Sequence, residues 1–143
     1  MKSSLLNAKG VYAIATTPFK ENGEIDFESV DRLSEYYLES GVTGVTILGV
    51  MGEAPKMNLE EQKNLVKRYV KNLRDKVPII IGVSNPGLDN LKSIAQEGMQ
   101  LGANGVMVAG MNGLKNNEQI ENYFNSVVQY LEDIPICLQD YPP

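Results

Sequence analysis

The sequence predicts an α/β fold of parallel strands, and three observations support this prediction. Short apolar runs, rich in β-branched residues, alternate with longer amphipathic segments along the whole chain. Successive runs start about 30 residues apart, which is the length of one βα unit. The runs are continuously apolar rather than alternating, as Ile79, Ile80 and Ile81 show, and this character is typical of parallel strands buried on both faces.

One amphipathic helix is expected between each pair of consecutive strands. The expected strands are residues 11–15, 45–48, 78–83, 105–108 and 134–138. The first helix begins after Asp26, a residue type that caps helices, and ends before Gly41, which suits a left-handed stop. Asn58 and Glu61 are spaced as a capping box at the start of the second helix.

The later helices also carry start and stop signals. Asp89 or Asn90 is expected to start the third helix, with Gly102 as its stop, and Asn117 is expected to cap the fourth. These elements fit two architectures, an open doubly wound sheet and part of a (β/α)8 barrel, which takes about 250 residues when complete. Periodicity alone does not separate the two. No low-complexity linker or internal domain boundary interrupts the chain.

Composition and charge narrow the range of partners. The net charge is −5, and the basic residues of segment 63–76 are interleaved with apolar ones, as on the solvated face of a helix. We therefore expect no nucleic-acid partner, because phosphate binding exploits a basic excess. No apolar run approaches the roughly 18 residues of a membrane span, and the first residues lack the apolar region of a signal peptide. A single cysteine fits a reducing compartment, so a cytoplasmic protein is expected.

The residue types present also limit the chemistry. Histidine is absent and cysteine occurs once, which removes the Ser-His-Asp and Cys-His mechanisms and the usual zinc sites. The same counts exclude every histidine-containing metal site. A nucleophilic lysine needs a desolvated site, so Lys9, Lys20, Lys56 and Lys115, which fall in loops or at helix starts, are expected to be solvated. Cys137 is expected to be a small buried apolar residue on a strand.

Five segments carry a resemblance to one enzyme family. They are KGVYAIATTPF (9–19), GVTGVTILGVMGEAPKMNLEEQ (41–62), VPIIIGV (77–83), AQEGMQLGANGVMV (95–108) and IPICLQDYPP (134–143). Together they are similar to the opening strands of the dihydrodipicolinate synthase / N-acetylneuraminate lyase family, and the second segment is the most specific of them. The resemblance covers essentially the whole chain and about half of a typical member, which is a complete barrel.

The resemblance implies both a fold and a chemistry. Residues 1–143 would be the N-terminal half of a (β/α)8 barrel, made of four βα units and the fifth strand. Family members are class I lyases or aldolases that hold pyruvate, or a related 2-oxo acid or sugar acid, as a Schiff base to a lysine on the sixth strand, without a cofactor. This chain ends before that strand, so the Schiff-base lysine is absent and the isolated chain is expected to be inactive. The intact protein is expected to be a homo-oligomer.

The resemblance also points to a loop after the second strand as a substrate-binding element. The segment Gly49-Val50-Met51-Gly52-Glu53 places two glycines around a tight turn, and such a turn can aim backbone amides at the substrate carboxylate. The family usually has hydroxyl residues where this chain has Val50 and Met51, so a proton relay through this position is lost. A simple turn that needs glycine flexibility is the alternative interpretation.

Other candidate residues stand at the ends of the first, fourth and fifth strands. Thr16 and Thr17 either add hydroxyls to the pocket or make strand-end hydrogen bonds. Residues 109–112 stand where the family has an aromatic stretch after the fourth strand, and Asn112 is the last of them. Gln139 falls where the family has its catalytic tyrosine, and Tyr141, two residues later, lies on the same side of an extended strand. Either Tyr141 supplies a phenol from this shifted position, or it is a packing or rim tyrosine and Gln139 or Asp140 orients the substrate.

Two other functions remain open at this point. The divergent pocket could bind a small carboxylate without turnover, as a sensor or a regulatory subunit. Alternatively, the chain could be a half-barrel that self-associates, because unpaired sheet edges and apolar barrel-facing residues need to be covered.

Overall fold

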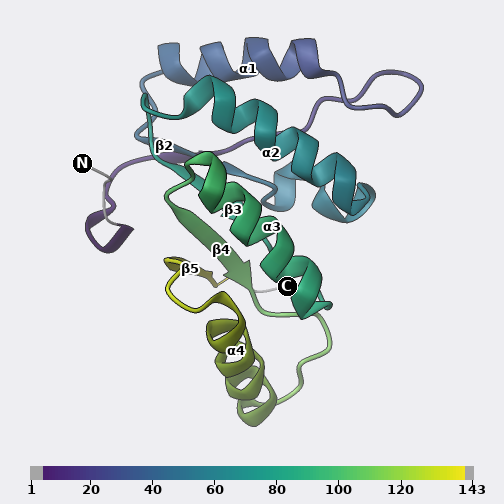
Figure 1. Ribbon diagram of the computed structural model, residues 1–143, viewed down its shortest axis with the longest axis vertical. Helices are drawn as coiled ribbons and strands as arrows, with labels where there is room; N and C mark the ends of the chain where they lie inside the picture. The colour runs from purple at the N-terminus through teal and green to yellow at the C-terminus, as the bar shows by residue number, and fades with distance from the viewer. Residues whose placement is uncertain (1–4, 141–143) are drawn as a thin grey trace.

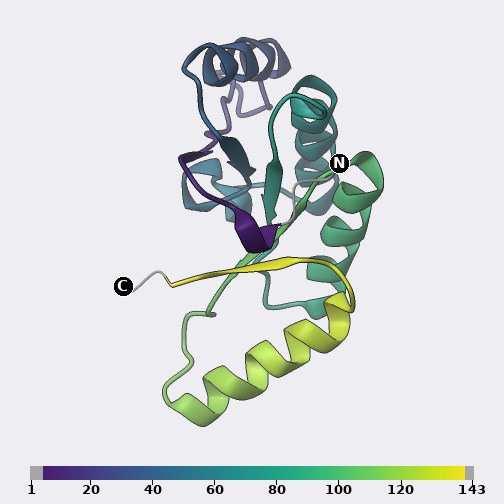
Figure 2. The same ribbon diagram turned by 90° about the vertical axis from the view of Figure 1, so that its left-hand side faces the viewer.

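The computed structural model describes residues 5–140, which form one curved sheet with the helices along its outer side (Figures 1 and 2). The strands are β1 (Tyr12–Ile14), β2 (Gly44–Ile47), β3 (Ile79–Gly82), β4 (Gly105–Ala109) and β5 (Ile136–Gln139). The α-helices are α1 (Phe27–Glu39), α2 (Leu59–Leu73), α3 (Leu88–Leu101) and α4 (Asn117–Leu131). Three short 3₁₀ helices are η1 (Leu5–Asn7), η2 (Val50–Gly52) and η3 (Ala54–Lys56). All five strands lie where they were predicted, with ends that differ by at most two residues.

The strand order of the sheet follows the order of the chain, β1-β2-β3-β4-β5, and every neighbouring pair is parallel. A doubly wound sheet reverses its strand order at a switch point, and the five described strands show no reversal. The sheet curves, with consecutive helices side by side along its outer side (Figure 2). The predicted arc of a (β/α)8 barrel is therefore confirmed.

The two faces of the sheet are identified by contacts with the helices. A Cβ on Gly98 of α3 would overlap Cδ1 of Ile81, so Ile81 points outward to the helix layer. Its register partners Ile47 and Val106 point the same way, and none of the three is exposed to solvent. The next residue along β3, Ile80, points inward and is still buried. Burial on both faces explains why the strands are continuously apolar in sequence.

The N-terminal segment crosses the inner face of the sheet. Leu5 of η1 lies against Gly105, the first residue of β4, where a Cβ would overlap the leucine side chain. Further along, the Val11 amide donates to Oγ1 of Thr43 at 3.1 Å, and the Thr43 amide donates back to the Val11 carbonyl at 2.8 Å. The segment thus spans from β4 to β1 at the amino-terminal end of the strands.

Four of the predicted helix signals are confirmed. The Asp26 carboxylate accepts a hydrogen bond from the backbone of the first turn of α1, at 3.1 Å. Asn58 and Glu61 form a complete capping box, with hydrogen bonds of 2.9 and 2.8 Å. Gly41 and Gly102 follow α1 and α3 with φ of 71° and 114°, the left-handed conformation expected of helix stops.

Three other predictions are wrong. Helix α3 begins directly after Gly87, which offers no side-chain cap, rather than at Asp89 or Asn90. Asn116, and not Asn117, caps α4, accepting from the amide three residues on at 2.9 Å. Asn116 and Asn117 have the same side chain, so the one that caps is the one whose backbone is extended just before the helix, which is Asn116. Cys137 is exposed rather than buried, because within the described residues β5 pairs with β4 only and nothing covers its other side.

A polar network joins α1 to α2. Arg68 donates from Nε and Nη2 to the Asp31 carboxylate at 2.7 and 2.5 Å, and Asn72 donates to the same carboxylate at 2.7 Å. The hydrogen bonds from Arg68, followed by the one from Asn72, hold the pKa of Asp31 below its ordinary value. Both partners of the ion pair are over a third exposed, so we expect it to contribute only about 0–1 kcal/mol.

We predict that Asp31→Asn makes the stability of the chain less sensitive to acid. A carboxyl whose folded-state pKa is depressed stabilises the fold above its unfolded pKa, and this stability is lost as the pH falls through the folded pKa. Urea unfolding measured at about pH 6 and about pH 2 gives the free energy of unfolding lost on acidification. This loss should be smaller in the variant, by up to about 1 kcal/mol. Asp133→Asn is the control, and an equal loss in the native and Asp31→Asn chains would contradict the prediction.

We predict that Gly82→Ala destabilises the chain strongly. A Cβ at Gly82 would overlap the backbone carbonyl of Leu48, and a backbone carbonyl cannot swing aside as a flexible side chain can. The expected loss is about 1–3 kcal/mol of unfolding free energy, as for other overpacked sites. Gly110→Ala, where a Cβ would meet nothing within 4 Å, should change it by less than about 0.5 kcal/mol. Equal midpoints of urea unfolding for the two variants would refute this.

Candidate functional site

The carboxyl-terminal ends of the strands lie along one edge of the sheet, because all five strands are parallel and pair with their neighbours in sequence. In barrel folds this edge carries the active site. The segments that leave the strands here are residues 15–17, 48–53, 83–85, 109–112 and 139–140. They contain all the candidate residues that the sequence indicated, apart from Tyr141, which lies outside the described residues.

Two tyrosines from the helix layer hold the segment that follows β1. The Tyr37 hydroxyl of α1 accepts from the Thr16 amide at 3.4 Å, and the Tyr69 hydroxyl of α2 donates to the Thr16 carbonyl at 2.8 Å. Tyr69 is fully buried, and this burial, together with the nearby Tyr37, raises the pKa of Tyr69 well above its ordinary value. The Tyr69 hydroxyl therefore keeps its proton and stays a donor. The Thr16 side chain is half-buried at the strand end.

Thr17 connects this segment to the loop after β2. Its Oγ1 donates to the Gly52 carbonyl at 2.6 Å, and both residues are buried. Of the two roles that the sequence left open for Thr17, the structure thus shows the strand-end hydrogen bond. Within residues 5–140 the Thr16 hydroxyl makes no hydrogen bond to the protein, so it is the freer of the two hydroxyls.

The loop after β2 is bounded by two residues in the left-handed conformation, Leu48 with φ of 57° and Glu53 with φ of 56°. This conformation costs roughly 1–2 kcal/mol for a residue with a Cβ. The Leu48 side chain is buried in the core, which offsets part of that cost. Between them, the Gly52 amide donates to the Gly49 carbonyl at 2.9 Å. The tight turn expected from the two glycines is therefore present.

The turn offers backbone donors and apolar side chains. Val50 and Met51 are 55% and 58% exposed, and they carry no hydroxyl. Within the described part of the chain, neither of their amides donates to another protein group. The Gly52 amide, in contrast, is engaged inside the turn. Of the three residues that the sequence indicated here, only Val50 and Met51 have backbone donors left for a ligand.

The next two pairs of strand ends are also in direct contact. Gly82 at the end of β3 packs so closely on Leu48 that a Cβ would overlap the Leu48 carbonyl. Ser84, two residues further, accepts from the Ala109 amide at the end of β4 through its Oγ, at 2.9 Å. Each strand end from β1 to β4 is thus joined to the next one by a short-range contact.

The segments after β4 and β5 hold the remaining candidates. Gln139 is half-buried and pairs in register with Ala109, one residue beyond the outward-facing Val108, so its side chain is on the inner face. Asn112 is exposed on the loop before α4. Among the candidates beyond β3, the structure therefore brings Gln139 to the inner rim and leaves Asn112 exposed to solvent.

The lysines of the loops are solvated. Lys9, Lys20, Lys56 and Lys115 are all exposed, as predicted, and Lys56 forms an ion pair with Glu53. Among residues 5–140, no three acidic, cysteine or histidine side chains gather as metal ligands. Nor does the same stretch contain a helix long and apolar enough to cross a bilayer.

Sequence reasoning missed Tyr37, Tyr69 and Ser84. Both tyrosines lie on the apolar stripes of their helices, and this position alone indicates packing. Their hydroxyls act on a backbone segment 21 and 53 residues away, and no local pattern encodes such a contact.

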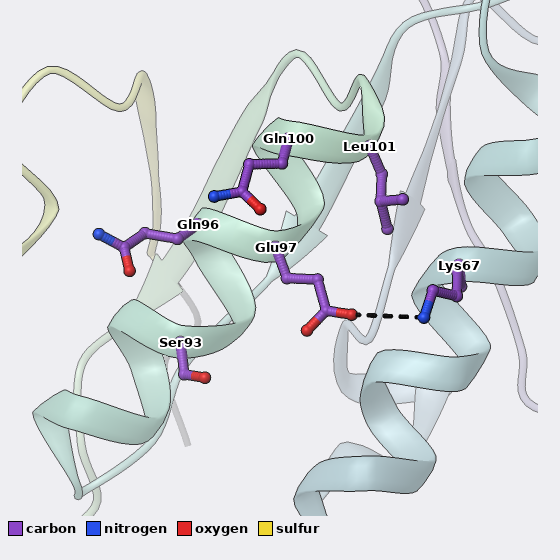
Figure 3. A pocket seen from close by; sticks show the side chains of 6 residues that line it. All are labelled: Lys67, Ser93, Gln96, Glu97, Gln100 and Leu101. Atoms are coloured by element: carbon purple, nitrogen blue, oxygen red, sulfur yellow. Dashed lines mark ion pairs between the residues drawn. The ribbon is translucent and has the colours of Figure 1, made fainter.

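The largest of the surface cavities described lies in the helix layer, away from the strand ends (Figure 3). It has a volume of about 430 Å³ and is an open hollow on the surface of α2 and α3. Its lining residues are Lys67, Ser93, Gln96, Glu97, Gln100 and Leu101. Lys67 and Glu97 form an ion pair of 3.9 Å across it. None of these residues follows a strand, so the cavity is separate from the candidate site.

Comparison with known proteins gives a consistent result. The 4-hydroxy-tetrahydrodipicolinate synthase of Thermotoga petrophila is 40% identical over 100 residues, which are 70% of this chain and 34% of that relative. Dihydrodipicolinate synthase of Rhodopseudomonas palustris superimposes with a TM-score of 0.90 at 43% identity, over 94% of this chain and 45% of that one. YagE, a prophage protein of Escherichia coli K12 solved with pyruvate, superimposes with a TM-score of 0.84 at 25% identity, over 93% of this chain and 45% of that one.

The chain matches less than half of each of these relatives. The sequence profile of the Dihydrodipicolinate synthetase family nevertheless matches residues 7–143, nearly all of this chain. The fold agrees with this match, since the described strands superimpose on those of a family member. The chain belongs to the dihydrodipicolinate synthetase family.

Proposed function

We propose that this chain forms the N-terminal half of a (β/α)8-barrel lyase that makes or breaks a carbon–carbon bond beside the carbonyl of a 2-oxo acid. The observation that supports this best is the convergence of five parallel strand ends in a chain of this family. Pyruvate is the simplest substrate of this class, and YagE was solved with pyruvate bound. A related 2-oxo acid or sugar acid fits the same chemistry.

The proposed mechanism is covalent catalysis through a Schiff base. A lysine amine adds to the keto carbon and water leaves, so that the protonated imine can accept the electron pair of the adjacent carbon–carbon bond. As the resemblance to the family implies, this lysine would lie on the sixth strand of the barrel, beyond the present chain. The loop lysines described here are exposed, which suits no nucleophilic role. In the proposal the present chain binds and orients the substrate and does not supply the nucleophile.

We assign the recognition of the substrate carboxylate to the Val50 and Met51 amides, which donate to no other protein group among the described residues. The Thr16 hydroxyl and the amide groups of Gln139 and Asn112 would orient the rest of the substrate. Tyr141 would supply the phenol that exchanges a proton. Val50 and Met51 have no side-chain hydroxyl, so they cannot relay a proton. The carboxylate site is kept, because in this proposal the backbone supplies its donors.

A second candidate function is binding of a small carboxylate without turnover, and the apolar Val50–Met51 pair favours it. The two functions differ in one respect. Both require the carboxylate site, whereas only the lyase requires an imine-forming lysine.

The arc carries exposed apolar side chains at both of its ends. Val11, beside β1, is 68% exposed, and Val128 of α4 and Leu138 of β5 are 54% and 59% exposed. Such surface needs a cover. In our proposal the second half of the barrel covers it, and the whole protein is a cytoplasmic homo-oligomer. Pairing of two half-barrels is the alternative.

We predict that borohydride traps pyruvate on a protein that continues through the sixth strand and not on residues 1–143 alone. The reduced imine is a stable secondary amine, so intact-mass spectrometry should show one added pyruvate unit on the longer protein only. Retro-aldol activity should follow the same division. An adduct on the 143-residue chain would refute our placement of the lysine. Binding by calorimetry without an adduct on the longer protein would favour the non-catalytic role.

We predict that the complete enzyme tolerates Met51→Ala and not Gly52→Ala. Backbone donation is insensitive to the Met51 side chain, so the affinity for pyruvate should change by less than about three-fold. A Cβ on Gly52 would lie 3.3 Å from the Ala15 carbonyl and push the turn away, which should weaken binding by roughly ten-fold. Calorimetry measures both affinities. A larger effect from Met51→Ala would show that its side chain, and not the backbone, contacts the substrate.

A further inference from the structure

The strongest unassigned feature is the pair of tyrosine hydroxyls that reach from the helix layer to the backbone of the site. Tyr69 is fully buried and Tyr37 is 9% exposed, and the hydroxyl of each contacts Thr16. A side chain that only fills the core has no need of a hydroxyl there, because burying an unpaired polar group costs free energy. Here each hydroxyl meets a backbone group of the segment that leaves β1.

This contact extends to the turn after β2 through the residue next to Thr16. The Thr17 hydroxyl donates to the Gly52 carbonyl at 2.6 Å, and Gly52 is the last residue of η2. The orientation of Thr16 therefore limits where Thr17 can place its donor. The turn that carries Val50 and Met51 is connected in this way, through Thr16 and Thr17, to α1 and α2.

The two tyrosines come from helices that are joined to each other at the surface. Arg68 and Asn72 of α2 hold Asp31 of α1 with three hydrogen bonds of 2.5–2.7 Å. Tyr69 follows Arg68 directly, and Tyr37 lies six residues after Asp31, near the end of α1. A shift of α1 against α2 would therefore move the two hydroxyls relative to each other.

We propose that Tyr37 and Tyr69 are positioning residues, which set the place of the η2 turn by holding Thr16 from both sides. The turn is thereby coupled to the packing of α1 on α2. The consequence for substrate binding rests on the proposed function, whereas the coupling itself is a property of the fold.

Amide hydrogen exchange measured by NMR on the 143-residue chain tests the coupling. The Gly52 and Glu53 amides donate within the turn at 2.9 and 3.2 Å, so their exchange reports its opening. Tyr69→Phe should accelerate exchange at both amides by roughly ten-fold, because a buried carbonyl loses its donor. The amides of Ile94 and Ala95 in α3 should change by less than about two-fold.

The matched control is Tyr123→Phe. The Tyr123 hydroxyl is buried and has no hydrogen-bond partner among the described residues, so the same chemical change removes no contact. This variant should leave the exchange of Gly52 and Glu53 as it is in the native chain. Tyr37→Phe removes the longer hydrogen bond of 3.4 Å and should give the Tyr69→Phe pattern at smaller amplitude, and it serves if Tyr69→Phe fails to fold.

A double variant tests the route of the coupling. Thr17→Val breaks the contact with Gly52, so adding Tyr69→Phe should accelerate the Gly52 and Glu53 amides no further. Equal acceleration throughout the chain, unchanged exchange in the turn, or an additive effect in the double variant would each overturn the proposal. None of these outcomes involves a ligand, so failure here is distinct from failure of the proposed function.

Discussion

The structure depends on one constraint, which is that every strand is hydrogen-bonded in parallel to the strand next to it in sequence. Two parallel neighbouring strands need a long connection that brings the chain back to the end of the sheet where the first strand began. Such connections are right-handed. Consecutive right-handed returns place all the helices on one side, so the sheet curves away from them. Inward side chains are crowded together as a result, and Thr46 and Ile80 are buried on the face opposite to the four α-helices of residues 5–140.

The same constraint collects all the strand ends at one rim, and three kinds of contact hold that rim. Thr17 binds the Gly52 carbonyl, Gly82 leaves room for the Leu48 carbonyl, and Ser84 accepts from the backbone of β4. Each of these contacts involves at least one backbone group. The form of the turn after β2 is thus largely independent of the side chains at positions 50 and 51, and residues that differ from the usual hydroxyls of the family can stand there without loss of the fold.

The fold could be predicted from the sequence to a large extent because its signals are local. The apolar runs predicted the strands, and Asp26 and Asn58 predicted two helix starts. Each of these signals depends only on residues that are close together in sequence. The prediction failed where two adjacent residues could serve as the same helix cap, as at Asn116 and Asn117. It also failed where burial depends on residues distant in sequence, as at Cys137. The site was predicted only in outline. The position of Thr17 followed from its strand, whereas its partner Gly52 and the contact of Tyr69 with Thr16 are tertiary and leave no periodic trace.

The crossing of the inner face by η1 has a consequence for the order of folding. Leu5 fits beside Gly105 only once β4 has been laid down, so about the first hundred residues must leave the ribosome before the beginning of the chain can dock. The closure of so long a loop is slow relative to the local helix and strand contacts. We therefore expect η1 to be among the last elements of the described arc to pack, with the inner apolar face exposed until then.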